Sequence, residues 1–375
     1  MKLRKLALIL HRYIGIVTGL LLVIISLTGS LLIFSEELDH FFNPQFLQVT
    51  PQVVRLSPQE VVEIAQKTYP DLKTNRIIVP HQPEQVYTVL MQSPNGGIDV
   101  YINPYTGAVL GSRPYQQTLR RILVNLHASF FAGDIGLSIA GICGIVFLLL
   151  SVTGLLLWNG WHHLYYGFKI RWKSPWQLLN YDLHKLGGVL SVVLLCILGF
   201  TGAALNFATP FESTIYWLTH SPSESPAPTS KVVAGIPPIS IDALLEKAKT
   251  TLPNAEIARI YPAKEPEATF NVLMELPQEN EFNKSTYLSL DQYTGELLQL
   301  QDPRKASLAK RILSAQGILH FGTYGGLVTR ILYFIVGLMP LGLFVTGLII
   351  WQQRRWAEAR RKEAKKVATS RLTHN

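Results

Sequence analysis

Four of the ten histidines stand at matched positions in the chain and have the chemistry of cofactor ligands. His11 and His184 each lie in a Leu-His-x-x-x-Gly stretch, and His127 and His320 each lie between a leucine and a glycine at one shared spacing. Two neutral imidazoles from facing helices are what the iron of a six-coordinate b-type haem requires. Zinc is less suited, because it takes four protein ligands and no cysteine is close to these histidines in sequence. The pattern predicts two haem b groups per chain, with His11/His184 and His127/His320 as axial ligands of the iron.

The histidines belong to a repeat that runs through the whole chain. His184 follows His11 by 173 residues, and His320 follows His127 by 193 residues. Thr-Gly pairs recur with the same two offsets, beginning at Thr28 and Thr201 and at Thr153 and Thr346. We interpret these small residues as helix-packing positions. A parallel repeat predicts a pseudo-twofold axis along the membrane normal, which would bring equivalent histidines face to face.

Four apolar stretches are long enough to cross a hydrocarbon core, which takes about 20 helical residues. They are Tyr13–Phe34, Ile135–Trp158, Leu186–Phe207 and Leu327–Trp351. Basic residues gather before the first stretch, between the second and third, and from Arg354 to Lys366. Because basic loops stay on the cytoplasmic side, both termini are expected to be cytoplasmic. The protein is therefore expected in the bacterial cytoplasmic (inner) membrane, with the lipid bilayer as a partner, and its positive charge gives no reason to expect nucleic acid.

The two long connections between spans have the pattern of small α+β modules that lie outside the cytoplasm. In the first, a capping box at Ser57 and Glu60 opens a helix to about Tyr69. Alternating strands are expected after it, at about 75–80, 85–92, 97–103 and 107–111. In the second, Ser240 caps a helix to about Thr251, and strands are expected at about 256–261, 267–275, 285–291 and 296–300. A Tyr-Thr-Gly turn precedes the last strand of each module. Residues 221–230, rich in proline and serine, read as an irregular link.

The fold class is thus an integral membrane α-helical bundle of four spans, built from two parallel repeats, with two external α+β modules. The expected divisions are span 1 (1–35), module 1 (36–116), an external approach segment and span 2 (117–160), a cytoplasmic loop (161–183), span 3 (184–208), a linker and module 2 (209–303), a second approach segment and span 4 (304–353) and a basic tail (354–375).

Basic residues precede both external histidines and run against the charge asymmetry of the other loops. They are Arg120, Arg121, Lys310 and Arg311, and Arg330 lies at the start of the fourth span. Contacts with haem propionates or with an anionic external ligand are one interpretation. A solvated face of an amphipathic approach helix is the other. The remaining histidines, including His162 and His163 in the cytoplasmic loop, have no counterpart in the repeat and read as surface residues.

Motifs for nucleotide cofactors are absent from the sequence. There is no Gly-x-Gly-x-x-Gly at a strand–helix junction, no P-loop and no His-Glu-x-x-His. The cytoplasmic segments are too short for a nucleotide-binding domain. If the chain moves electrons, a cytoplasmic reductase or a quinol must supply them.

The combination of paired Leu-His and Thr-Gly helices with Tyr-Thr-Gly turn modules resembles the PepSY-associated transmembrane proteins. Within that family, the pattern is similar to the iron-regulated PiuB-like and FoxB-like membrane proteins, and the resemblance covers Lys2 to about Arg355. It implies four helices with two external PepSY modules, reduction of ferric siderophores by a dihaem core, and His11, His184, His127 and His320 as the haem ligands.

The leading hypothesis is a transmembrane b-type cytochrome and oxidoreductase. Electrons would enter at the His11/His184 haem, cross to the His127/His320 haem, and reduce an external ferric chelate to release Fe(II). A rival of another class is a haem-free membrane regulator whose PepSY modules bind a peptide or a protease propeptide. A small-solute transporter ranks last, because the spans carry no acidic residue for ion coupling.

Overall fold

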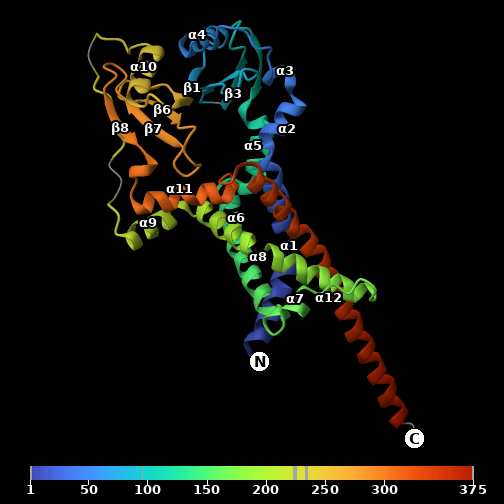
Figure 1. The fold of residues 1–375 in the computed structure, drawn as a ribbon. Helices are drawn as coiled ribbons and strands as arrows, with labels where there is room; N and C mark the ends of the chain where they lie inside the picture. Colours follow the sequence, from blue (N-terminus) through green and yellow to red (C-terminus); the bar gives the residue numbers. More distant parts are fainter. Residues whose placement is uncertain (1, 95, 223–225, 233–234, 374–375) are drawn as a thin grey trace. The chain divides into compact units, whose positions relative to one another are not determined.

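A computed structural model describes residues 2–94, 96–222, 226–232 and 235–373 of the chain (Figure 1). The link expected at 221–230 and His374 therefore fall partly or wholly outside the described residues. The chain divides into two compact units. The first holds Met1–Ile33, Leu123–Ala208 and Leu319–Asn375, and the second holds Phe34–Ile122 and Thr209–Ile318.

Four helices of the described residues are long and apolar enough to cross a membrane, which makes the chain an integral membrane protein. They are α1 (Lys2–Ile33), α6 (Gly133–Leu157), α8 (Trp176–Asn206) and α12 (Gly326–Thr373). The four predicted spans are confirmed. The helices run beyond the apolar stretches, because hydropathy marks only the part in hydrocarbon while backbone hydrogen bonding continues into the aqueous ends.

The spans pack as a ring in which each helix contacts mainly two others. α6 packs against α1 and α8, and α12 also packs against α1 and α8, so that α1 and α8 face each other across the bundle. Gly144 of α6 and Gly199 of α8 let their backbones approach closely, since a Cβ at Gly144 would lie 2.9 Å from the Gly199 carbonyl oxygen. Outward side chains such as Val17 (79% exposed) and Ile135 (73% exposed) are apolar, as a lipid-facing surface requires.

Shorter helices adjoin the spans. The turn η2 (Asn159–Trp161) and α7 (Leu164–Phe168) connect α6 to α8. Helices α5 (Leu119–Ser129) and α11 (Leu308–Phe321) precede α6 and α12, and α9 (Ala208–Thr219) follows α8. His127 lies in the last turn of α5 and His320 in the last turn of α11.

The second unit is built on one antiparallel sheet of eight strands in the order β4-β3-β2-β1-β5-β6-β7-β8. The strands are β1 (Lys73–Ile78), β2 (Tyr87–Ser93), β3 (Gly96–Ile102), β4 (Val109–Pro114), β5 (Glu256–Tyr261), β6 (Phe270–Glu275), β7 (Ser285–Leu290) and β8 (Leu297–Gln301). All eight agree with the expected strands to within a few residues. Each half of the sheet has the same order along the chain, one helix followed by four strands.

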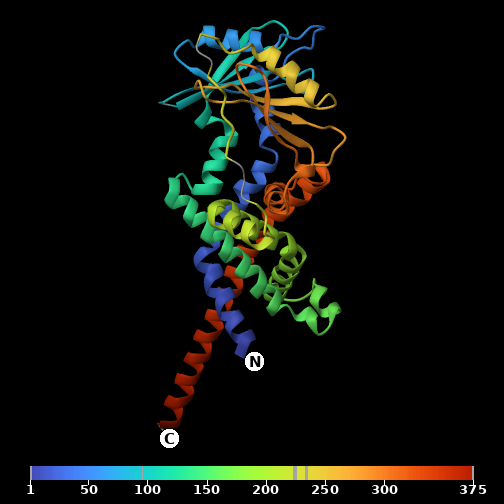
Figure 2. The same ribbon diagram turned by 90° about the vertical axis from the view of Figure 1, so that its left-hand side faces the viewer.

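One face of this sheet carries both module helices, α4 (Pro58–Thr68) and α10 (Ile241–Thr251), as Figure 2 shows. The predicted caps are present: Ser57 and Glu60 form the capping box of α4, and the Ser240 hydroxyl accepts a hydrogen bond at the start of α10. Alternate residues of the strands face these helices and form a single core that crosses both modules. Ile77 and Ile260 lie at its centre, and both are fully buried.

The two modules are joined into one body, which the sequence had left open. Strands β1 and β5 pair antiparallel, with Ile77 opposite Ile260 and Ile78 opposite Arg259. The helix starts are also cross-linked, because the amide of Gln59 donates to Asp242 Oδ1 and the Gln59 side-chain oxygen accepts from the amide of Ile241. A shared core and shared hydrogen bonds exclude independent swinging of the modules.

The opposite face of the first module is covered by two helices that the sequence did not predict, α2 (Ser35–Phe42) and α3 (Pro44–Leu47). Phe46 stacks on Tyr101, and Arg113 makes two 2.7 Å hydrogen bonds with the carboxylate of Asp39. These helices are too short to give a periodic apolar signal, and they depend on the sheet that they cover.

Candidate functional site

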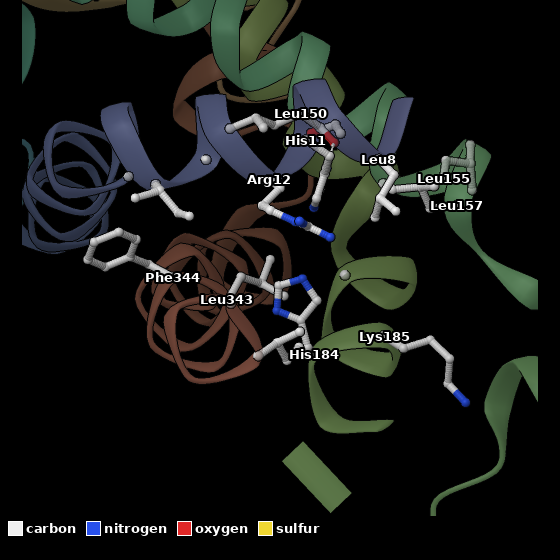
Figure 3. Close-up of a pocket in the computed structure, with 18 of the residues that line it drawn as sticks. Leu8, His11, Arg12, Leu150, Leu155, Leu157, His184, Lys185, Leu343 and Phe344 are labelled. Carbon is white, nitrogen blue, oxygen red and sulfur yellow. Dashed lines mark hydrogen bonds between the residues drawn. The ribbon is translucent and has the colours of Figure 1, made fainter. Parts of the chain in front are cut away.

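His11 and His184 face each other across the bundle, from α1 and α8. Their ring centroids are 6.2 Å apart and the ring planes are nearly perpendicular, at 86°. Figure 3 shows the two imidazoles directed toward a common space. The first predicted pair is therefore brought together, by helices that hardly touch one another directly.

Hydrogen bonds to neighbouring helices fix the orientation and tautomer of both rings. His11 Nδ1 lies 3.1 Å from the carbonyl oxygen of Leu150 and 3.1 Å from Thr153 Oγ1, both on α6. A carbonyl only accepts, so Nδ1 carries the proton and Nε2 is left with a free lone pair. His184 is held in the same way, with Nδ1 2.8 Å from Thr346 Oγ1.

The threonine hydroxyls can only accept from the histidines. Thr153 donates its hydrogen to the Leu149 carbonyl (2.8 Å), and Thr346 donates to the Gly342 carbonyl (2.6 Å), each within its own helix. A hydroxyl has one hydrogen, so each threonine receives the Nδ1 hydrogen of its histidine. An imidazole anchored through Nδ1 presents Nε2 for metal coordination, and such partners raise the basicity of the ligand.

The second pair, His127 and His320, is built from the same parts. Their ring centroids are 6.0 Å apart at an interplanar angle of 54°. His127 Nδ1 lies 2.8 Å from the Ile25 carbonyl and 3.3 Å from Thr28 Oγ1 on α1. His320 Nδ1 lies 2.9 Å from Thr201 Oγ1 on α8. As in the first pair, the Nδ1 hydrogen bonds leave Nε2 as the nitrogen that could coordinate a metal.

Burial keeps these two imidazoles neutral. It lowers the pKa of His127, and it lowers the pKa of His320 to about 3, with a smaller contribution from the neighbouring His127. The neutral form is the one that binds a metal, because a protonated imidazole has no free lone pair.

The glycine after each threonine makes room for a histidine. A Cβ at Gly29 would lie 2.9 Å from His127 Cε1, and one at Gly154 would lie 3.1 Å from His11 Cε1. The corresponding distances are 3.2 Å from Gly202 to His320 and 3.4 Å from Gly347 to His184. All four Thr-Gly pairs thus combine a hydrogen-bond acceptor with the space in which the ring edge lies. The interpretation as helix-packing positions missed this role, although the shared offsets of Thr-Gly and His were the signal.

A pair of histidines suits a cofactor in which the metal already has most of its ligands. Among the described residues, no group of three or more His, Cys, Asp or Glu side chains could hold a bare metal ion. A bare zinc ion needs three or four protein ligands, whereas a haem iron needs only two axial ones. A ligand nitrogen lies about 2 Å from its metal and about 1 Å from its ring centre, so two rings sharing one metal have centroids about 6 Å apart. Both pairs match that spacing.

A cavity of about 720 Å³ surrounds His11 and His184 within the membrane unit. This volume lies in the range of about 300–1,000 Å³ found for cofactor and ligand pockets. Most of the wall is apolar and comes from all four spans, including Leu8 of α1, Leu155 of α6, Val192 of α8 and Phe344 of α12, and basic side chains also line it. Gly15 and Gly188, the glycines of the two Leu-His-x-x-x-Gly stretches, also line it. The cavity has the size and polarity for a flat apolar macrocycle.

Among the basic residues proposed from sequence, Arg120, Arg121, Lys310 and Arg330 each bond to a different neighbouring group. Arg120 and Arg121 lie in the first turn of α5, where Arg120 pairs with Glu36 (3.0 Å, both side chains exposed) and Arg121 bonds to Gln116. Lys310 donates to Gln301. Lys310 and Arg311 lie in the first turn of α11. Arg330 donates to the backbone carbonyl of Ile33. Their role as anion contacts stays a prediction.

Comparison with known proteins gives two matches. A family model described as the PepSY-associated TM region matches residues 8–354. A protein of Pseudomonas aeruginosa named Uncharacterized protein PA4219 is 27% identical, over 62% of this chain and 63% of its own length. The chain thus spans less than two thirds of that relative, whose name states no activity.

Proposed function

The chain belongs to the family of PepSY-associated transmembrane proteins, and from that premise we propose that it is a transmembrane b-type cytochrome with two haem groups. One observation carries the proposal: two pairs of half-buried imidazoles, each ring anchored through Nδ1 to a neighbouring helix, lie with their centroids 6.2 and 6.0 Å apart. A histidine with a purely structural role does not require this arrangement, in which Nδ1 is hydrogen-bonded and Nε2 is left unprotonated, and the arrangement occurs four times.

In this proposal, His11 and His184 hold one haem b, and His127 and His320 hold the other. When bound, the haem supplies one-electron redox chemistry at each site. The threonines fix the ligand tautomer, and the glycines leave room for the ring edges. The apolar part of the wall around His11 and His184 would limit the access of water to a bound haem.

The overall reaction that we propose is electron transfer from the cytoplasmic side to an external ferric chelate, so that the protein is an oxidoreductase. Fe(III) takes one electron, which matches the unit of charge that a b-type site delivers. Reduction to Fe(II) weakens binding by hard oxygen ligands and would release the iron. The resemblance to PiuB-like and FoxB-like proteins supports a ferric siderophore as the substrate.

The same proposal sets the location and partners. The basic termini support a bacterial cytoplasmic membrane with both ends of the chain in the cytoplasm and the sheet unit outside. A cytoplasmic reductase or a membrane quinol would donate the electrons.

The test is an absorption spectrum of the purified full-length protein before and after dithionite, with a haem assay per chain. We expect two low-spin b-type haems per chain. His11→Ala or His184→Ala should remove one, and His127→Ala or His320→Ala should remove the other. His163→Ala is the control, because His163 lies in the loop between α6 and α8 and outside both pairs.

Two low-spin haems in all four alanine variants would contradict the assignment. Colourless protein, expressed with haem supplied, would contradict the cytochrome itself and favour a haem-free regulator.

A further inference from the structure

The cavity around His11 and His184 is strongly cationic. Its lining includes five basic side chains, Arg4, Lys5, Arg12, Lys185 and Arg354, and no carboxylate among the described lining residues. An excess of positive charge in an apolar membrane pocket is costly unless an anion compensates it. The cavity is therefore suited to a ligand that is apolar in its body and anionic at one edge.

Most of these cations are already satisfied or face outward. Lys185 contacts the buried Asp182 at 3.4 Å and donates to the carbonyls of Tyr166 and Lys169. Arg4 donates to the Leu157 carbonyl. Lys5 and Arg354 line the cavity but are exposed residues, so water can solvate their charges. None of these four needs a bound anion to be stable.

Arg12 differs from them. Its side chain is half-buried, and among the described residues it has no hydrogen-bond or ion-pair partner. It follows His11 on α1, and Figure 3 shows its guanidinium extending toward the space between His11 and His184. A guanidinium presents a planar fork of donors that matches a carboxylate. An unpaired fork at this position lacks an acceptor that a bound ligand would supply.

We propose that Arg12 binds a propionate carboxylate of the haem held by His11 and His184, and so fixes which edge of the macrocycle faces the cytoplasmic end of α1. This inference rests on the proposed function and assigns a residue to it. It differs from the external cations predicted from sequence, because Arg12 lies beside a ligand histidine inside the cavity. A phospholipid headgroup is the other source of negative charge near this end of the helix, and the test separates the two.

The experiment compares haem with its dimethyl ester, in which both carboxylates are neutral. Full-length protein made without haem is placed in nanodiscs of zwitterionic lipid. It carries His127→Ala, so that binding is measured only at the His11/His184 site. We expect this protein to bind haem about 10 to 100 times more tightly than the ester, as one or two charge-assisted hydrogen bonds predict. Arg12→Gln should abolish this preference, Arg12→Lys should keep part of it, and the ester should bind both forms alike.

Arg355→Gln is the matched control, because Arg355 follows the lining residue Arg354 on α12 but does not itself line the cavity, and its guanidinium stacks over Trp351. It should retain the full preference for haem. Folding of the Arg12 variants is checked without the His127→Ala change, by their retention of the second haem.

If Arg12→Gln still prefers haem over the dimethyl ester, the inference is overturned. It is also overturned if Arg12 affects binding only in nanodiscs with anionic lipid, because the residue would then bind a lipid headgroup. Failure of the His127→Ala protein and of the otherwise unaltered chain to bind either compound would instead overturn the proposed function.

Discussion

Each candidate ligand is defined by three residues rather than one. A histidine from one helix meets a threonine and the following glycine of another, and the same triple occurs at His11, His127, His184 and His320. The threonine, together with a backbone carbonyl at His11 and His127, places the proton on Nδ1, and the glycine decides how close the ring can come. Both contributions are measurable separately.

Removing one threonine hydroxyl should weaken haem binding at the His11/His184 pair while leaving both histidines in place. In Thr153→Val, His11 loses one of its two Nδ1 acceptors, and we expect haem affinity at that site to fall about tenfold, the lower end of the effect of losing an outer-shell partner. Thr153→Ser should restore the affinity. Haem titration of the apo-protein measures both.

Thr18→Val is the control for this prediction, because in the described part of the chain the Thr18 hydroxyl bonds only to the Ile14 carbonyl of its own helix. An equal loss in this variant would indicate general destabilisation of the bundle by a Thr→Val change rather than loss of the Nδ1 acceptor.

Filling the space beside a ring should displace the ligand. A Cβ at Gly29 would lie 2.9 Å from His127 Cε1, so Gly29→Ala forces the imidazole to move. We expect the haem at His127 and His320 to be lost or to become high-spin, which the reduced spectrum would show. The haem at His11 and His184 should remain. Gly342→Ala on α12 is the control, because a Cβ there meets nothing within 4 Å and alanine favours a helix. A normal spectrum in Gly29→Ala would show that this close approach is unimportant.

At the scale of elements, two of the long helices serve both sites. Helix α1 carries His11 of one pair and, 17 residues later, Thr28 for the other, and α8 repeats this with His184 and Thr201. A helix rises about 1.5 Å per residue, so about 25 Å of rigid backbone separates the two functions. The helices therefore fix the spacing of the sites as well as their ligands.

The junction of β1 and β5 should make the two modules unfold together. Ile77 and Ile260 face each other across it and are fully buried, so Ile77→Ala or Ile260→Ala should each cost about 2–4 kcal/mol of unfolding free energy. Because they share one core, the double variant should deviate from additivity by about 0.5 kcal/mol or more. Denaturant unfolding, followed by proteolysis of each module, measures these changes in unfolding free energy.

Val54→Ala provides the reference, since Val54 is 75% exposed and its loss should change stability little. Proteolysis of module 1 without any change in module 2 would mean that the modules fold independently.

At the scale of the whole molecule, the proposed electron transfer requires that the sheet unit (Phe34–Ile122 and Thr209–Ile318) and the basic tail (354–375) lie on opposite sides of the membrane. Val53 (99% exposed) lies in the sheet unit, and Glu358 is exposed near the end of α12. With Cys143 and Cys196 replaced by alanine, Val53→Cys should react with an impermeant maleimide in intact spheroplasts. Glu358→Cys should react only after permeabilisation. The reverse pattern would invert the proposed direction of transfer.

The sequence by itself determined the spans, the module strands and the four histidines. These features are local: hydropathy reports a span within about 20 residues, alternation reports a strand, and a fixed offset identifies His184 once His11 is noticed. The repeat also predicted which histidines would face each other, because equivalent residues meet at a twofold axis.

Only the tertiary structure decided what surrounds them. The contacts His11–Thr153 and His127–Thr28 join residues 142 and 99 positions apart, and the β1–β5 junction joins modules separated by two spans. The same holds for Arg12, which sequence counted only among the basic residues before the first span. Whether a cation in a membrane pocket has a partner depends on the side chains that neighbouring helices bring to it, and those contacts exist only once the bundle has packed.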